Sequence, residues 1–277
     1  MRDYWLTQYI LSAIGWGYLI AVLLFVALVL WLVKGKTAKT ICLLVVIGLA
    51  SILPLQGYKE YAKEKNAEAA YRVRLAKAQA LFDERCKTAG EKIYKTVENV
   101  EGVLLTKVRP QRTNFSDQFV LDDPYGHDVG EIGYIMSFLW DGDDKPLGYS
   151  YVDVLQADGS RTRHYLRKDR PRSNDRYADL IETKLNPNTP TFTVDYEDIS
   201  SSEERKNWIA GGALRVFDTK TNSMVAERIG FIFDTALGNT GGGRGPWGAA
   251  ISCHSEDRKY GHNARFVMKI LKPISEK

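Results

Sequence analysis

The sequence contains little cysteine and little proline, three and nine residues respectively among 277. So few cysteines exclude a disulfide-dense miniprotein, and the glycine and proline contents exclude a collagen-like chain. A large excess of charge of one sign is also missing, because 38 Lys and Arg residues stand against 34 Asp and Glu residues. With 44% hydrophobic residues, the composition matches neither a wholly disordered chain nor a coiled-coil rod. The length predicts one or two domains.

Charge is absent from two long stretches near the N-terminus. Residues 4–33 and 40–58 contain no Asp, Glu, Lys or Arg, and the segment KGKTAK between them contains three lysines. This region carries three of the four net positive charges, and the remaining 219 residues are close to neutral, with 34 basic against 33 acidic groups. A basic groove for nucleic acid therefore has no support.

The two uncharged stretches predict a helical hairpin that spans a lipid bilayer. A span needs about 20 apolar residues, and we expect spans at 9–33 and 40–56. Only six residues join the uncharged stretches, so both outer ends of the hairpin would lie on one side of the membrane. The alternative, a pair of buried core helices, is opposed by thirty consecutive uncharged residues. The lipid bilayer is thus an expected partner.

Charge alone does not decide which side of the membrane holds the rest of the chain. Three lysines in the loop favour a cytoplasmic loop under the positive-inside rule. Basic residues after the second span favour the opposite orientation. They are interleaved with glutamates on a predicted helix, and large domains cross the membrane largely regardless of such charge.

The chain is predicted to have three regions: a transmembrane hairpin at 1–58, an amphipathic stalk helix at 59–93 and a soluble β-rich domain at 94–277. Strong helix formers dominate the stalk, and its apolar residues recur at spacings of three and four from Tyr71 to Ile93. Short alternating runs follow and predict an α+β fold whose β-domain is mainly antiparallel, a sandwich or a partly open barrel. We expect strands at 103–108, 132–140, 149–156, 161–166, 191–196, 213–218, 224–233 and 266–270, hairpin turns at 157–160 and 219–223, and a short helix at 201–208.

The cysteines allow two interpretations. Cys42 lies inside the second span and is expected to be a small apolar residue there. Cys86 falls on the apolar stripe of the stalk helix, and Cys253 follows a short apolar run. They are either two inert buried thiols or a disulfide that joins the stalk to the C-terminal part of the domain, and their spacing leaves both open.

A glycine-rich stretch, residues 238–248, follows a predicted strand as phosphate-binding loops do. However, no Lys-Ser/Thr pair closes it, and Pro246 and Gly248 disrupt the helix start that such a loop needs. We expect an exposed loop in which Trp247 returns to the core or anchors a contact. Arg and Trp dominate interface hot spots, so Arg244 and Trp247 are also candidates for binding a partner.

An acidic stretch, LDDPYGHD at 121–128, offers oxygen ligands for a hard cation or forms a solvated turn. It lacks the alternation of an EF-hand loop. The histidines form no HExxH motif, the cysteines no CxxC motif, and no G-x-S-x-G motif marks a nucleophile. We therefore predict no catalytic residue, metal site or cofactor. Further candidates for partner contacts are Asp122, Asp123, Tyr125 and His127.

Motifs along residues 82–273 resemble an uncharacterised family of bacterial membrane-anchored or exported envelope proteins. The motifs are RCKTAGEKIY at 85–94, LDDPYG at 121–126, YEDIS at 196–200, WIAGGALRVFDTKTNSMVAERIGF at 208–231 and GGRGPW at 242–247. The family pattern has cysteines at the positions of Cys86 and Cys253, so the resemblance implies a disulfide between them. A disulfide requires an oxidising compartment, which implies a periplasmic domain. The chain departs from the pattern between Trp140 and Gly148 and after Cys253.

The resemblance also implies a function, because members accompany secreted lipase-type toxins as candidate immunity proteins. The first hypothesis is a periplasmic protein, anchored in the inner membrane, that binds and neutralises a protein partner such as a toxin. A cytoplasmic β-barrel that senses a small molecule is a second hypothesis, and an envelope hydrolase that joins a histidine to a Ser or Asp is a third. The sequence does not set the oligomeric state or identify the partner.

Overall fold

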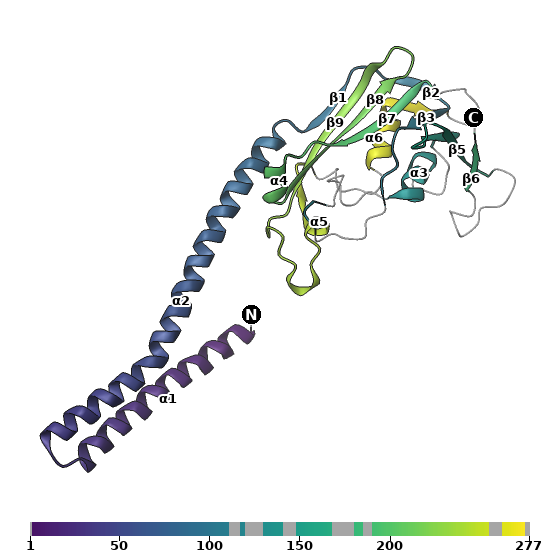
Figure 1. Ribbon diagram of the computed structural model, residues 1–277. Coiled ribbons are helices and arrows are strands. Elements are labelled where there is room, and N and C mark those ends of the chain that lie inside the picture. Colours follow the sequence, from purple (N-terminus) through teal and green to yellow (C-terminus); the bar gives the residue numbers. More distant parts are fainter. Residues whose placement is uncertain are drawn as a thin grey trace. The chain divides into compact units, whose positions relative to one another are not determined.

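The computed structural model describes residues 2–110, 117–119, 130–140, 148–167, 180–184, 190–254 and 262–274, with side chains described from residue 13 onward. The contacts divide the chain into two compact units, Met1–Arg72 and Val73–Lys277. Helix α2 contributes to both units, and each unit is described by itself (Figure 1).

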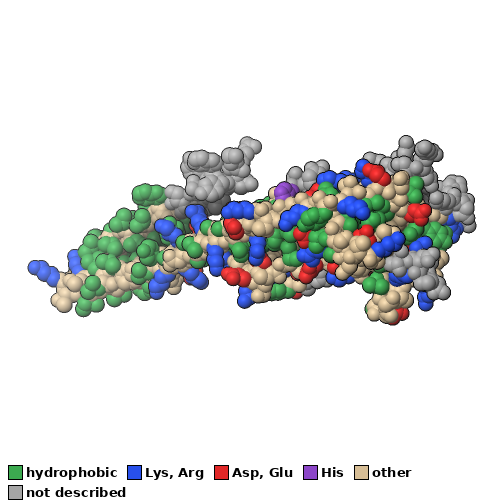
Figure 2. All heavy atoms as spheres, turned by 90° about the horizontal axis from the view of Figure 1, so that it is seen from above, with side chains coloured by type: hydrophobic (Ala, Val, Ile, Leu, Met, Phe, Trp, Pro, Cys, Tyr) green, Lys and Arg blue, Asp and Glu red, His purple; other side chains and the backbone are tan. Residues whose placement is uncertain are grey.

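The first unit is a hairpin of two long apolar helices. Helix α1 spans Arg2–Leu32 and α2 spans Lys36–Cys86. The hydroxyl of Tyr18 donates a hydrogen bond to the carbonyl of Ala50, which ties the two antiparallel helices together. Both helices are long and apolar enough to cross a membrane, and their most apolar windows are not buried by the protein. Hydrophobic side chains cover this unit in Figure 2. The expected pair of apolar N-terminal helices is confirmed.

Helix α2 passes without a break from its apolar part into the expected stalk. Pro54 lies inside the helix, and the helix ends at Cys86, before Gly90 begins the first strand. Alanine, lysine and glutamate, which favour helix, fill the part that follows the apolar segment.

The second unit contains one mixed sheet whose pairing order is β1-β9-β8-β7-β3-β4-β5-β6, with β10 also paired to β9. Strand β3 is parallel to both β4 and β7, and the other pairs of this sheet are antiparallel. In the described part of the chain β1 and β6 end this order without pairing to each other, so the strands form no closed barrel. The strands are β1 (Gly90–Ile93), β3 (Gly102–Leu105), β4 (Tyr151–Leu155), β5 (Arg161–Leu166), β6 (Leu180–Lys184), β7 (Phe192–Asp198), β8 (Ile209–Asp218), β9 (Ser223–Phe233) and β10 (Ile251–Ser252).

The α+β class is confirmed, and the sheet is mixed where we expected a mainly antiparallel domain. A second, two-stranded sheet pairs β2 (Val97–Val100) with β11 (Leu271–Pro273) in parallel. Both predicted hairpin turns are present, between β4 and β5 and between β8 and β9. Asp158 and Asp218 begin these turns by accepting backbone N–H groups two residues further on, as Asp does in turns.

Two of the expected strands are helices. The segment expected as a strand at 132–140 is α3 (Glu131–Leu139), and the segment expected at 266–270 belongs to α6 (His262–Ile270). Six of the nine α3 residues are buried, and an apolar run of this length has no period that separates a strand from a buried helix. In α6 the buried residues Ala264, Val267 and Ile270 recur every three positions, as on one face of a helix.

Helices cover both faces of the sheet (Figure 1). Helices α3 and α6 pack with Val103, Val152 and Leu214 in the larger hydrophobic core. The last turns of α2 pack in a second core with Phe231 and Phe233. These two phenylalanines alternate along β9 with Ile232, and register places them on the strand face that carries Ile209 and Gly211 of β8.

Candidate functional site

The end of α2 docks onto the sheet through the predicted apolar stripe. Ala78 and Phe82 are buried, and the Phe82 ring lies 5.4 Å from the Phe233 ring, centroid to centroid. Leu75 and Ala89 are partly buried in the same core. Of the other stripe residues, Cys86 is also partly buried in this core, whereas Tyr71 is exposed and Ile93 lies on β1.

A disulfide closes the docked end of α2. Cys86 is bonded to Cys253, with the two Cα atoms 5.3 Å apart and a separation of 167 positions in the sequence. A cross-link that closes so long a loop stabilises a fold by about 2–5 kcal/mol in the chain-entropy treatment. The third cysteine, Cys42, is free. A structural disulfide of this kind indicates an oxidising compartment.

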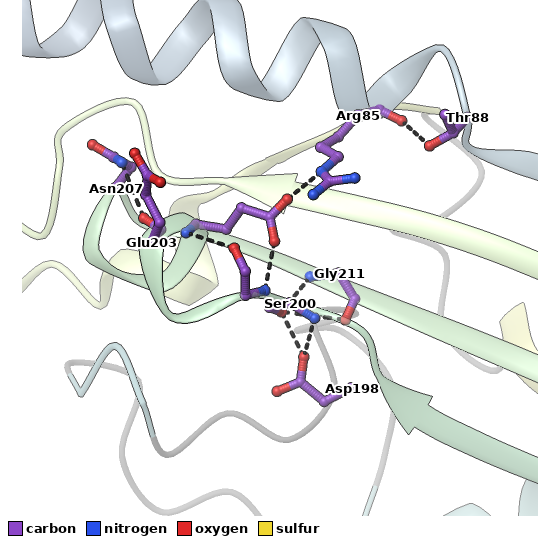
Figure 3. Close-up of polar contacts among 9 residues, drawn as sticks. Arg85, Thr88, Asp198, Ser200, Glu203, Asn207 and Gly211 are labelled. Atoms are coloured by element: carbon purple, nitrogen blue, oxygen red, sulfur yellow. Dashed lines mark hydrogen bonds and ion pairs between the residues drawn. The ribbon is translucent and has the colours of Figure 1, made fainter.

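An ion pair joins the same end of α2 to the short helix α4 (Ser202–Lys206) (Figure 3). Arg85 donates from Nε to Glu204, whose side chain is only 2% exposed. Glu204 also accepts from the backbone N–H of Ser201 at 2.5 Å, while Ser201 Oγ accepts from the backbone N–H of Glu204 at 3.2 Å. This reciprocal pair is a capping box, so one carboxylate both starts α4 and holds α2.

The neighbouring residue, Arg205, connects α4 to the end of β7. Its Nη2 atom donates to Asp198 at 2.5 Å. Asp198 in turn accepts from the backbone N–H of Ser200, and Ser200 Oγ accepts from the backbone N–H of Gly211 at 2.7 Å (Figure 3). The network ties α4, β7 and β8 together. Arg205 is only 4% exposed, so it acts inside the fold.

The glycine-rich loop is built on a fully buried carboxylate, Asp234, which directly follows β9. Asp234 accepts hydrogen bonds from both Nη1 and Nη2 of Arg244, and Nη1 lies 3.0 Å from Oδ2. It also accepts the backbone N–H groups of Ala236 and Gly238. Gly238 has φ +86°, and a Cβ there would lie 2.1 Å from the Trp208 ring. This position therefore requires glycine.

Between these fixed ends the loop is exposed. Residues 239–243 are all exposed, and they include the 3₁₀ turn η2 (Gly241–Gly243). The loop extends away from the sheet before the chain returns through α5 (Pro246–Ala249) (Figure 1). The loop is therefore accessible to solvent, while the ion pair of Arg244 with the buried Asp234 fixes its two ends.

Trp247 lies in the core at the return of this loop. Its side chain is fully buried, its ring lies 5.2 Å from the Trp208 ring, and the guanidinium of Arg205 lies 5.5 Å from its centroid. The indole N–H donates to the carbonyl of Asp117 at 2.9 Å. Arg205 reaches the carbonyl of Gln118 next to it. The segment that leads toward the acidic stretch is thus held against the base of the glycine-rich loop.

Four residues predicted from the sequence lie close together where the end of α2 and the base of the glycine-rich loop pack in the second core. Cys86, Cys253 and Trp247 share the second core, and Arg244 bonds to Asp234 beside it. Trp247 was expected either to return to the core or to anchor a contact, and it lies in the core. The Arg244 guanidinium faces the inside of the loop. Asp122, Asp123, Tyr125 and His127 lie outside the described residues.

Sequence reasoning missed Glu204, Arg205 and Asp234. The motif Ser201-Ser202-Glu203-Glu204 carried a usable signal, because Ser followed three residues later by Glu marks a capping box. Arg205 and Asp234 carry no local signal, because their partners are brought to them by the fold.

Among the described residues no group of three or more His, Cys, Asp or Glu side chains is placed to hold a metal ion. His164, on β5, is 7% exposed, and burial lowers the pKa of its imidazole.

The chain was compared with protein-family models, curated proteins and solved structures, and none of them matched.

Proposed function

We propose that the chain is a binding protein anchored in the bacterial inner membrane, with its sheet domain in the periplasm, that neutralises a protein partner. The observation that carries this proposal is the disulfide between Cys86 and Cys253, at the end of the helix that also supplies an apolar span. Disulfides persist in oxidising compartments, and in bacteria the periplasm is such a compartment. The cytoplasmic sensor hypothesis would require the same cysteines to be reduced.

The partner would be met by the exposed loop at 239–243. Its base is pre-organised by the Asp234–Arg244 pair, so less conformational entropy is lost when a partner binds. Membrane anchoring would add effective concentration against a partner that acts at the bilayer surface. The resemblance to envelope proteins favours a secreted lipase-type toxin as the partner. The chain would then be the immunity protein of that toxin.

The orientation is tested with single cysteines in a Cys42→Ser background. Thr240→Cys places a thiol in the exposed loop, and Gly35→Cys places one in the turn between α1 and α2. A membrane-impermeant maleimide applied to spheroplasts should label the first and not the second. Labelling of Gly35→Cys alone would contradict a periplasmic domain.

Neutralisation is tested by co-expression with the product of the adjacent gene directed to the periplasm. The intact chain should restore growth and co-purify with that product. The variant Thr240→Lys should lose both effects while keeping its melting temperature, because position 240 is exposed. The matched control is Thr221→Lys at the equally exposed β8–β9 turn, which makes the same substitution and adds the same charge. Growth arrest that the intact chain does not relieve, with no co-purification, would refute the proposal.

A further inference from the structure

Strand β6 lies at one end of the sheet and leaves a regular edge. Its five residues, Leu180–Lys184, pair with β5 without a register shift, and in the described part of the chain no strand pairs with its other side (Figure 1). Such an edge directs unpaired backbone N–H and C=O groups outward, where another strand can pair with them. Proteins block exposed edges with proline, bulges or charged side chains, and β6 contains neither proline nor bulge. The charged side chains therefore decide which strand can be added.

The two charged residues of β6 have opposite signs and lie on the same face. Glu182 and Lys184 are both exposed, and Thr183 between them points to the opposite face. Neither charged side chain forms a hydrogen bond or an ion pair with the residues that the structure describes. Each acts on a neighbouring group only through space, Glu182 on His164 and Lys184 on Asp158. Both charges are therefore available to a strand that pairs with this edge.

A second copy of the chain complements this edge when the two β6 strands run antiparallel. The two-fold axis is then perpendicular to the sheet, and because side chains alternate between faces, the axis must pass beside a residue that faces its own copy. An axis at Thr183 places Glu182 opposite Lys184 of the second copy, twice, and the two Thr183 residues opposite each other. Opposite charges and paired threonines are favourable cross-strand pairs. An axis at Glu182 would instead bring two carboxylates together.

The other edge of the sheet, β1, lacks this complementarity. An axis at Glu91 would place two carboxylates opposite each other, and an axis at Lys92 would do the same with two ammonium groups. Glu91 is also held by Lys269 of α6 at 2.6 Å. The pattern of charge thus opposes self-pairing at β1 and supports it at β6. We infer that β6 is an interface between two copies of the chain, in which antiparallel pairing centred on Thr183 joins their sheets.

The test uses the full chain in membranes, because the shared strand is short and confinement raises the effective concentration of the two copies. Thr183→Cys in a Cys42→Ser background places two thiols beside the axis. Directly opposed Cα atoms of antiparallel strands lie about 4.5–5.5 Å apart, within the range for a disulfide. Oxidation with copper phenanthroline should therefore give a covalent dimer on non-reducing gels.

The matched control for this cross-link is Thr221→Cys in the same background, at the exposed β8–β9 turn. It reports random collisions and should give several-fold less dimer. An equal dimer yield from the two variants would overturn the inference. So would cross-linking of the Thr183→Cys variant to a different protein, because that protein would then occupy the edge.

Two charge reversals test the register. In the Thr183→Cys background, Glu182→Lys and Lys184→Glu should each lower the dimer yield about tenfold, because each variant alone brings like charges together at two positions. Co-expression of the two variants with different tags should restore a dimer between them, since every Lys then faces a Glu. This recovery also shows that both variants are folded. An undiminished dimer of either variant alone, or no recovery in the mixture, would overturn the inference.

Discussion

Arg85, in the last turn of α2, donates through Nε to Oε1 of Glu204 in α4, although 119 positions separate them in the sequence. The carboxylate is 2% exposed and the arginine 43% exposed, so the pair sits at the border between core and solvent. One residue further on, Cys86 is bonded to Cys253. A polar contact and a covalent bond therefore hold the same end of the same helix.

Replacing Glu204 with alanine should lower the free energy of unfolding of the domain by about 2–4 kcal/mol, because it removes a buried charged partner and half of the capping box. The measurement is denaturant unfolding of the full chain in detergent, followed by tryptophan fluorescence. Glu203→Ala is the matched control. Glu203 is the neighbouring residue, but it pairs with Lys77 at the surface, where the Lys77 side chain is 70% and the Glu203 side chain 68% exposed. Loss of this exposed pair should lower the free energy of unfolding by less than about 0.5 kcal/mol. Equal effects of the two substitutions would show that the buried pair does not hold α2.

The disulfide between Cys86 and Cys253 predicts how many thiols react when the chain is denatured. The chain purified without reductant and denatured should expose one free thiol, that of Cys42, and three after reduction. The double variant Cys86→Ser/Cys253→Ser should unfold about 2–5 kcal/mol more easily than the oxidised chain. Its stability should not respond to reductant. Three free thiols before reduction would contradict the disulfide.

Two glycines of the same loop should differ in their tolerance of alanine. Gly238 and Gly242 both have positive φ, +86° and +70°, so each alanine carries a backbone cost of about 1–2 kcal/mol. At Gly238 the new methyl group also meets the Trp208 ring, whereas at Gly242 nothing lies within 4 Å. Overpacking adds about 1–3 kcal/mol at Gly238 alone. The unfolding midpoints of the two variants provide the comparison, and equal midpoints would contradict this packing.

His164 predicts a loss of stability in mild acid. Burial lowers the pKa of the folded imidazole below the unfolded value of about 6.5, with Glu182 and Asp153 opposing the shift. The unfolded state then binds more protons, so the free energy of unfolding falls as the pH drops below about 6.5, by at most about 1.4 kcal/mol per pH unit for one group. The loss ends once the pH falls below the folded pKa. Between pH 5 and 7.5 the urea unfolding midpoint should change less steeply with pH in His164→Gln than in the unchanged chain. An equally steep change would show that another group causes the pH dependence.

Local patterns predicted the parts of this fold that depend on local physics. Two stretches without charge became two long apolar helices, and the turns at 157–160 and 219–223 joined the expected strands, the first with Asp158 inside it and the second directly after Asp218. The stripe through Ala78 and Phe82 faces the core because a helix repeats its contacts every three or four residues. The α3 segment was predicted wrongly because it is short and apolar, which makes a strand and a buried helix alike in sequence. The α6 segment was predicted wrongly because only 266–270 was considered, which is too short to show the helical spacing of Ala264, Val267 and Ile270.

The sequence by itself determined the apolar hairpin, the helix that follows it and the presence of a sheet domain, because each follows from spacing and composition. Only the tertiary structure decided which carboxylates matter. Asp234 and Asp153 look like other acidic residues in the sequence, and the capping-box motif at Glu204 does not reveal its ion pair, yet each of the three is buried against one arginine. The two arginine partners of Asp234 and Asp153 lie ten residues away, and that of Glu204 lies 119 positions away. Burial and pairing arise from how the strands and helices pack, and no local pattern encodes them.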